Sequence, residues 1–329
     1  MSVRVVRVAL VVVAIALIAA LPVLGDNYLL RLGTMFAMYA VMALSWNFIG
    51  GYAGYPSFAT AAFFGLGAYT GAILQANGLP MPLAWVAACL AAAGFAALLG
   101  LSILHLKGHY FAIASLVVGE VLLEVATSWT SLTGGGMGLN LPIIRIPIAA
   151  QARLFFWAML GLAVIALIAN WIVASRRLGF GLRCIRQNED ASSMVGIDTT
   201  LYKVAAFVLS AVFVGGAGAI YASWVFYIEP PDVFSVLLSV KPIVMAMLGG
   251  AGTVLGPAIG AGIFLVMEEF VWRNFLDVHA AVLGVIIVAL IFFLPNGVLG
   301  FRGFRRGRGG RGRSGAGGRG FARFARRRA

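Results

Sequence analysis

Long apolar stretches separated by short polar segments run through almost the whole chain. A stretch of about 20 apolar residues is long enough to cross the hydrocarbon layer of a membrane as a helix. The pattern predicts an all-α, polytopic integral membrane protein of about ten transmembrane helices. The expected spans are residues 7–24, 28–49, 57–75, 82–104, 110–129, 154–174, 204–226, 236–250, 254–272 and 280–295. The least regular are 57–75 and 236–250, because Gly or Pro interrupts them.

The longest polar interruption inside the chain is residues 175–203. Basic and acidic residues alternate there with small and apolar ones, namely Leu182, Ile185, Ala191, Met194 and Val195. Their roughly helical spacing predicts a short amphipathic helix. Gly196 is expected to end that helix, because Gly adopts a left-handed conformation without strain. A helix of this kind between membrane spans is a candidate docking segment for a soluble partner.

The distribution of charge predicts the orientation and the domain division. Of the 329 residues, 62% are hydrophobic and 11% are charged, whereas a soluble domain has about 25% charged residues. Eleven arginines after Phe301, with no acidic residue, supply most of the net charge of +13. The positive-inside rule places residues 175–203 and both termini in the cytoplasm. We therefore expect a transmembrane domain, 1–301, and a disordered Arg/Gly-rich cytoplasmic tail, 302–329, which favours membrane lipid over nucleic acid as a partner.

The Gly-rich segment after the second span has two interpretations. Its glycines permit close helix packing through small residues. Alternatively, the segment is a broken helix that lines a translocation pathway, since irregular backbone is tolerated in a membrane only where protein or a water-filled cavity surrounds it. In the second interpretation Tyr55, Ser57 and Thr60 are the polar groups of the pathway.

Two carboxylates lie within the fifth predicted span. Glu120 and Glu124 are four residues apart and therefore on one helical face. Carboxylates do not face lipid, so the pair either lines the pathway or forms structural hydrogen bonds across helices. At neutral pH we expect at least one of them to be protonated or paired, with Lys241 as a candidate partner.

The chain has no residue pattern for catalysis. It lacks the G-x4-G-K-[ST] phosphate loop, so any ATP hydrolysis belongs to another polypeptide. His105 and His109 have zinc-ligand spacing but no third ligand nearby, and Cys89 and Cys184 form no ligand cluster. We expect no metal, no cofactor and no enzymatic activity in this chain.

Several blocks together resemble one transporter family. Asp190-Ala191-Ser192, three residues and then Gly196 resemble the EAA-x3-G signature of ABC importer permeases. The blocks WN-x3-GYAG and AAFFG within residues 46–65, LGG-x-GT-x2-GP at 248–257 and LPNGVLG at 294–300 follow in the family's order. In this respect the chain is similar to the permease subunits of bacterial branched-chain amino-acid ABC importers of the LIV-M type.

The resemblance implies a set of partners and of coupling residues. The partners would be two cytoplasmic ATP-binding subunits, a homologous second permease and a periplasmic solute-binding protein, which would land on loops 131–153 and 227–235. The protein would lie in the bacterial inner membrane. The residues that would couple it to the ATPase are Arg186, Glu189, Asp190, Ala191, Ser192 and Gly196. Two alternatives stay open: a urea or amide ABC importer permease, and an ATP-independent secondary transporter that uses Glu120 and Glu124 for ion coupling.

Overall fold

The computed structural model describes residues 18–20, 22, 27–142, 146–274, 284, 297 and 298. Within them the chain is almost entirely helical. In chain order the elements are α2 (Asn27–Trp46), the π-helix η2 (Asn47–Tyr52), α3 (Thr60–Ala76), α4 (Met81–Ile103), α5 (His109–Ser128), α6 (Thr130–Thr133), the 3-10 helix η3 (Gly135–Met137), β1 (Leu139–Asn140), α7 (Ile148–Ser175), α8 (Arg177–Gln187), α9 (Glu189–Met194), α10 (Thr199–Val225), β2 (Tyr227–Ile228), α11 (Pro230–Val233), α12 (Val236–Gly249) and α13 (Gly256–Asn274).

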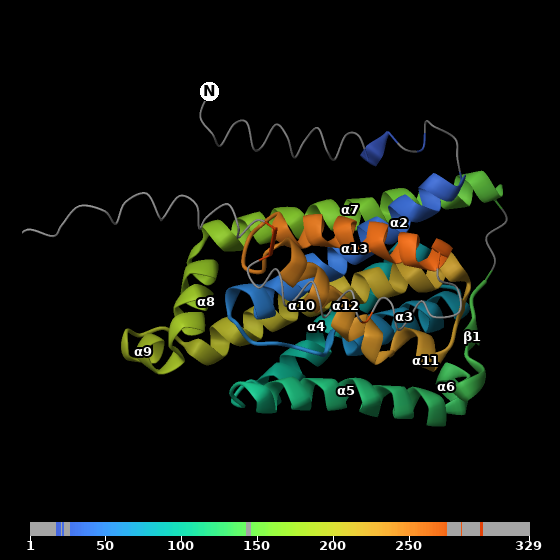
Figure 1. Ribbon diagram of the computed structural model, residues 1–329. Coiled ribbons are helices and arrows are strands. Elements are labelled where there is room, and N and C mark those ends of the chain that lie inside the picture. Colours follow the sequence, from blue (N-terminus) through green and yellow to red (C-terminus); the bar gives the residue numbers. More distant parts are fainter. Residues whose placement is uncertain are drawn as a thin grey trace, which may run out of the picture.

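The long helices form a bundle in which they run roughly side by side (Figure 1). α10 packs against α3 and α4 at the centre, and α2 packs against α7 and α13 on one side. α5 lies along the opposite side (Figure 1). The all-α membrane fold expected from the hydrophobic pattern is confirmed, since β1 and β2 contribute only one short antiparallel pair, Leu139 with Ile228 and Asn140 with Tyr227.

Each predicted span between residues 28 and 272 coincides with one helix of the bundle. Six described segments are long and apolar enough to cross a membrane: Asn27–Tyr52, α4, α5, α7, α10 and Pro230–Gly249. α3 has 17 residues, and α13 carries three charged residues near its end. The predicted span 280–295, most of 7–24 and the tail 302–329 lie outside the described residues, so the total of ten spans stays a prediction.

Small residues allow the central helices to approach closely. A Cβ atom on Gly67 of α3 would lie 2.0 Å from the carbonyl oxygen of Gly215 in α10, and a Cβ on Gly218 would lie 2.0 Å from that of Phe64. Both distances are far below any real contact, so only Gly fits at this crossing. The close-packing interpretation of the Gly-rich segment therefore holds for α3. The helix does break at residues 53–59, but a pathway lined by this break stays a prediction.

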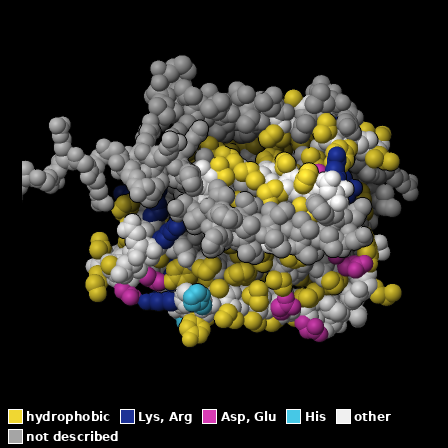
Figure 2. Space-filling model, in the orientation of Figure 1, with side chains coloured by type: hydrophobic (Ala, Val, Ile, Leu, Met, Phe, Trp, Pro, Cys, Tyr) yellow, Lys and Arg dark blue, Asp and Glu magenta, His cyan; other side chains and the backbone are white. Residues whose placement is uncertain are grey.

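Successive long helices run in opposite directions, so the connections between them lie alternately at the two ends of the bundle. The turns 53–59, 104–108 and 250–255 lie at one end together with α8 and α9 (Figure 1). The turn 77–80, the β1–β2 pair and α11 lie at the other end. Between the two ends, apolar side chains cover most of the described surface, and acidic side chains appear along the edge where α5 lies (Figure 2).

Candidate functional site

The candidate docking segment, residues 177–197, is a pair of short helices that projects from one end of the bundle (Figure 1). Its local structure follows from its sequence. Leu182 and Ile185 of α8 are buried against the bundle, as amphipathic spacing predicts. Asn188 then caps α9, because its side-chain oxygen accepts a hydrogen bond from the backbone N–H of Ala191 at 3.0 Å.

The end of α9 is a Schellman motif. Gly196 has a φ of +89°, its N–H donates to the carbonyl of Ser193 and the N–H of Ile197 donates to that of Ser192, which is the bonding pattern of that motif. The predicted helix stop is therefore confirmed.

The tip of the docking segment differs from the sequence-based expectation. The amphipathic pattern grouped Met194 and Val195 with the buried residues Leu182 and Ile185. In the structure Met194 is 87% exposed and Val195 is 82% exposed. The chain breaks at Asn188, so α9 does not continue the buried face of α8. The docking segment thus presents an apolar tip beyond the charged residues.

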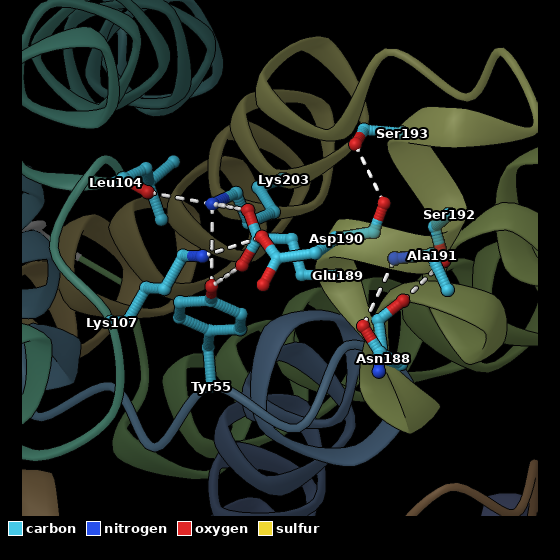
Figure 3. A network of polar contacts seen from close by, with 10 residues as sticks. All are labelled: Tyr55, Leu104, Lys107, Asn188, Glu189, Asp190, Ala191, Ser192, Ser193 and Lys203. Atoms are coloured by element: carbon cyan, nitrogen blue, oxygen red, sulfur yellow. Dashed lines mark hydrogen bonds and ion pairs between the residues drawn. The ribbon is translucent and has the colours of Figure 1, made fainter.

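A buried ion pair ties α9 to the bundle (Figure 3). The ammonium of Lys203, whose side chain is 3% exposed, donates to Glu189 Oε1 at 2.6 Å and to the carbonyl oxygen of Leu104 at 2.7 Å. It also lies 3.3 Å from the hydroxyl of Tyr55, which itself donates to the second carboxylate oxygen of Glu189. One amine thus joins α9, α10, the end of α4 and the turn after η2.

The surroundings of Glu189 favour its charged form. Partial burial alone would raise the pKa of Glu189, but hydrogen bonds from Lys203 and Tyr55 and the charge of Lys203 outweigh it and lower the pKa below its ordinary value of 4.5. The neighbouring pair is different, because Lys107 and Asp190, 2.8 Å apart, are both largely exposed. The hydrogen bond and charge of Asp190 raise the pKa of Lys107.

A second contact from the docking segment reaches the π-helix η2. The guanidinium Nη1 of Arg186 donates to the carbonyl oxygen of Gly51 at 2.6 Å. A Cβ on Gly54 would lie 2.8 Å from Cγ of Arg186, so the arginine stem lies directly on the turn that follows η2. Arg186 and Glu189, two of the residues expected to couple the chain to an ATPase, bind Gly51 and Tyr55 of the bundle itself, and their coupling role stays a prediction.

Asn47, the first residue of η2, connects this π-helix to the Gly-rich turn 250–255. Its amide nitrogen donates to Asn170 Oδ1 and to the carbonyl of Thr253, each at 3.0 Å. Its amide oxygen accepts from the backbone N–H of Gly252 at 2.7 Å. Asn170 is also buried and donates to the carbonyls of Leu44 and Ala166. These buried amides satisfy backbone groups where α2 changes into a π-helix.

The predicted pathway groups Tyr55, Ser57 and Thr60 are buried within the chain. Tyr55 belongs to the ion-pair network described above. The hydroxyl of Ser57 accepts from the N–H of Ala59 at 3.2 Å within the turn. Of the three, Tyr55 contacts the docking segment through Glu189, and the role of all three in a pathway stays a prediction.

Glu120 and Glu124 lie on the exposed face of α5. Ile113, Val117, Val121 and Val125 are exposed on the same helix. Glu124 accepts a hydrogen bond from Ser128 at 3.2 Å, and neither carboxylate forms a salt bridge with another described residue. Lys241 as their partner is wrong: it lies 2.7 Å from Glu268 Oε1 and 3.1 Å from the Tyr39 hydroxyl, and it packs on the other side of the bundle.

In the part of the chain that the structure describes, no three His, Cys, Asp or Glu side chains gather in one place.

Sequence reasoning missed Lys203 and Asn47 as site residues. A lysine at the start of an apolar run, seven residues after the predicted helix stop at Gly196, was the available signal for Lys203. Asn47 stood within a quoted motif but carried no assigned role. The apolar pair Met194-Val195 directly before Gly196 was the available signal for the exposed tip.

Comparison with known proteins gives one consistent result. Residues 28–294 match the family model described as "Branched-chain amino acid transport system / permease component". The chain is 28% identical over 322 residues to the high-affinity branched-chain amino acid transport system permease protein LivM of Salmonella typhimurium strain LT2, covering 88% of this chain and 73% of LivM. It is 28% identical over 323 residues to LivM of Escherichia coli K12, covering 89% and 74%.

A more distant similarity extends over half of the chain. The autoinducer 2 import system permease protein LsrC of Salmonella paratyphi B is 24% identical over 182 residues, covering 51% of this chain and 50% of LsrC. No solved structure matches.

Proposed function

The chain belongs to the family of branched-chain amino acid transport permeases, and from this membership we propose that it carries branched-chain amino acids across the inner membrane as the permease subunit of an ABC importer. As a member of that family it is an integral membrane transport subunit, and ATP is hydrolysed by partner subunits. The observation that carries the proposal is the family match over residues 28–294, which includes both the bundle and the docking segment.

The docking segment supports an interaction with ATP-binding subunits. It combines an exposed apolar tip, Met194 and Val195, with the exposed residues Asp190 and Ala191. An apolar tip surrounded by polar groups fits a concave surface on a soluble protein. Gly196 shapes the tip, while Arg186, Glu189 and Ser192 attach it to the bundle or to α9 itself. The complex would contain two ATP-binding subunits. They would lie on the cytoplasmic side of the membrane, the same side as both termini of this chain.

The exposed face of α5 supports an interaction with a second permease. Apolar side chains alone would be compatible with lipid, but Glu120 and Glu124 are not. A homologous permease that covers this face would remove both carboxylates from lipid and would enclose a polar route between the two subunits. In that arrangement Glu120 and Glu124 line the translocation pathway at the interface.

The opposite end of the bundle supports a landing surface for a solute-binding protein. There the β1–β2 pair holds the segment after α6 against the segment before α11. The hydroxyl of Tyr227 donates to Glu229 at 2.8 Å and to the carbonyl of Met137 at 2.8 Å. These contacts join residues 131–142, the first part of the predicted loop 131–153, to the predicted loop 227–235, and support one surface with exposed polar groups.

The test is reconstitution of the full complex. The chain is co-expressed with the ATP-binding subunits, second permease and solute-binding protein encoded beside it, purified and placed in proteoliposomes. We expect ATP-dependent uptake of radiolabelled L-leucine. Uptake of urea instead would support the alternative urea or amide importer, and uptake of autoinducer 2 would support a solute like that of LsrC. Uptake by the chain without ATP-binding subunits would overturn the ABC mechanism in favour of a secondary transporter.

A further inference from the structure

Two separate contacts join the docking segment to one turn of the bundle. Arg186 of α8 donates to the carbonyl of Gly51, at 2.6 Å. Glu189 of α9 accepts from the hydroxyl of Tyr55, four residues further along the chain. The two contacts therefore hold two points, Gly51 and Tyr55, of the same connection between α2 and α3; Figure 3 shows the contact of Tyr55.

Separating Glu189 from Lys203 costs a large free energy. Lys203 is almost fully buried and has three acceptors around its ammonium. If α9 moved away alone, a buried ammonium would lose its counter-charge, which is strongly unfavourable. The pair that Asp190 of α9 forms with Lys107 of the turn 104–108 is exposed, and such pairs contribute little, because water replaces the lost contact. Movement of α9 should thus carry Tyr55 and Lys203 with it.

The turn that the docking segment holds is itself joined to a second one. Asn47 bonds to Gly252 and Thr253, and a Cβ on Gly252 would lie 2.9 Å from Arg186 Nη1 and 3.0 Å from the Gly51 carbonyl oxygen. The π-helix η2, the turn 250–255 and Arg186 are therefore in direct contact. A displacement of α8–α9 reaches the ends of four helices: α2, α3, α12 and α13.

We propose that Lys203 and Arg186 are positioning residues that link the docking segment to the α2–α3 connection, which consists of η2 and the turn 53–59. Through this link, movement imposed on α9 by a partner subunit is passed to that connection. Lys203 acts through Glu189 and Tyr55, and Arg186 acts through the Gly51 carbonyl. The inference rests on the proposed function, because an ATP-driven partner must supply the movement.

The experiment uses the reconstituted complex and measures ATP hydrolysed per L-leucine transported. The variants are Lys203→Met, Glu189→Gln and Tyr55→Phe, and the matched control is Lys107→Met, which removes the exposed pair from the same helix. We expect each of these three variants to continue hydrolysing ATP, while the amount of ATP consumed per leucine transported rises about fivefold or more. Fivefold is about the lower end of common coupling effects. The control should keep the wild-type ratio. A purely structural role would lower the amount of complex and leave this ratio unchanged, which would overturn the proposal.

A double-mutant cycle decides the case if Lys203→Met does not assemble. Tyr55→Phe and Glu189→Gln are nearly isosteric and should assemble. Residues that act as one unit give non-additive effects, so we expect the double variant to be no worse than the more impaired single variant. Additive effects would show that Tyr55 and Glu189 act separately and would overturn the link.

A second readout separates failure of this inference from failure of the proposed solute. Ser57 lies buried in the linked turn, and Ser57→Cys, with Cys89 and Cys184 replaced by Ala, reports on that turn without any transport. We expect the rate of thiol labelling to change when ATP and vanadate are added, and this change to be lost with Lys203→Met. An unaltered ATP response in Lys203→Met would overturn the link even if leucine is not the solute.

Discussion

At Gly196 the chain takes a φ of +89° in open space, where an added Cβ would meet no atom within 4 Å. A substitution there acts through backbone strain alone, at about 1–2 kcal/mol for a residue with a Cβ and more for a β-branched one. Gly196→Val should therefore distort the end of α9, leave the bundle intact and reduce ATP-driven uptake per complex by about tenfold, the effect of 1.4 kcal/mol.

Gly78 provides the control for this substitution. It ends α3 at the other end of the bundle with a φ of +85°, also in open space, and with the same pair of hydrogen bonds, from Gly78 to Gln75 and from Leu79 to Leu74. Gly78→Val carries the same strain away from the docking segment and should transport normally. Equal loss of uptake in both variants would show that general destabilisation, and not docking, explains the effect.

The Glu189 carboxylate makes attachment of the docking segment dependent on pH. Its pKa is lowered from 4.5 in the folded protein, so its contribution to stability is present above pH 4.5 and is lost as the pH falls through the lower folded pKa. We expect wild type to melt at a higher temperature than Glu189→Gln at pH 7, and the difference to shrink below about pH 4.5. Thermal unfolding of the purified protein in detergent between pH 3 and 7 measures it. A difference that grows toward acid would contradict the assignment.

At the scale of the elements, α9 carries an apolar tip that nothing in the described part of the chain covers. Burying a large apolar side chain contributes about 1.5–3 kcal/mol, so replacing both Met194 and Val195 by Ser should weaken association with the ATP-binding subunits by about tenfold or more. The amount of ATP-binding subunit retained on an affinity-tagged chain measures this. Met137→Ser is the control, because Met137 is also 87% exposed but lies at the other end. Full retention by the double variant would exclude the tip as the docking surface.

Helix α5 has the second uncovered face. If Glu120 and Glu124 line the pathway, Glu120→Gln and Glu124→Gln should impair uptake by about tenfold without lowering the amount of assembled complex. If the pair is structural, the Gln variants should function and the Leu variants should fail to assemble. Val121→Leu, on the same exposed face, controls for changes of packing. Normal uptake by both Leu variants would contradict both interpretations.

The sequence predicts the helices better than the contacts between them. Hydrophobic length alone locates the long helices α2, α3, α4, α5, α7, α10, α12 and α13, because a membrane helix satisfies its own backbone. The Schellman glycine was also predictable, since its cause is local. Lys203, Arg186 and Asn47 were not, because their roles depend on partners 14 to 206 residues away. The exposure of Met194 likewise depends on the break at Asn188, which a single amphipathic pattern does not reveal.

At the scale of the whole molecule, the two ends of the bundle must lie on opposite sides of the membrane. The docking segment and the turns 53–59 and 250–255 share one end, and the β1–β2 pair and α11 share the other. Lys107 and the arginines of α8 lie at the first end, and from the positive-inside rule we expect this end to face the cytoplasm. This arrangement is the condition for contact with ATP-binding subunits on one side and with a solute-binding protein on the other.

Cysteine labelling in intact cells tests this orientation. Cys89 and Cys184 are both partly buried and are replaced by Ala first. Single cysteines then replace Asn140 and Asp232 at one end and Ser193 and Arg313 on the other side. Ser193 is the better probe of the docking segment, because it is exposed whereas the neighbouring Ser192 is buried. A membrane-impermeant thiol reagent should label the first two positions in intact cells and all four after the cells are opened. Labelling of Ser193→Cys from outside would place the docking segment beyond the reach of any cytoplasmic ATPase and would overturn the importer mechanism as a whole.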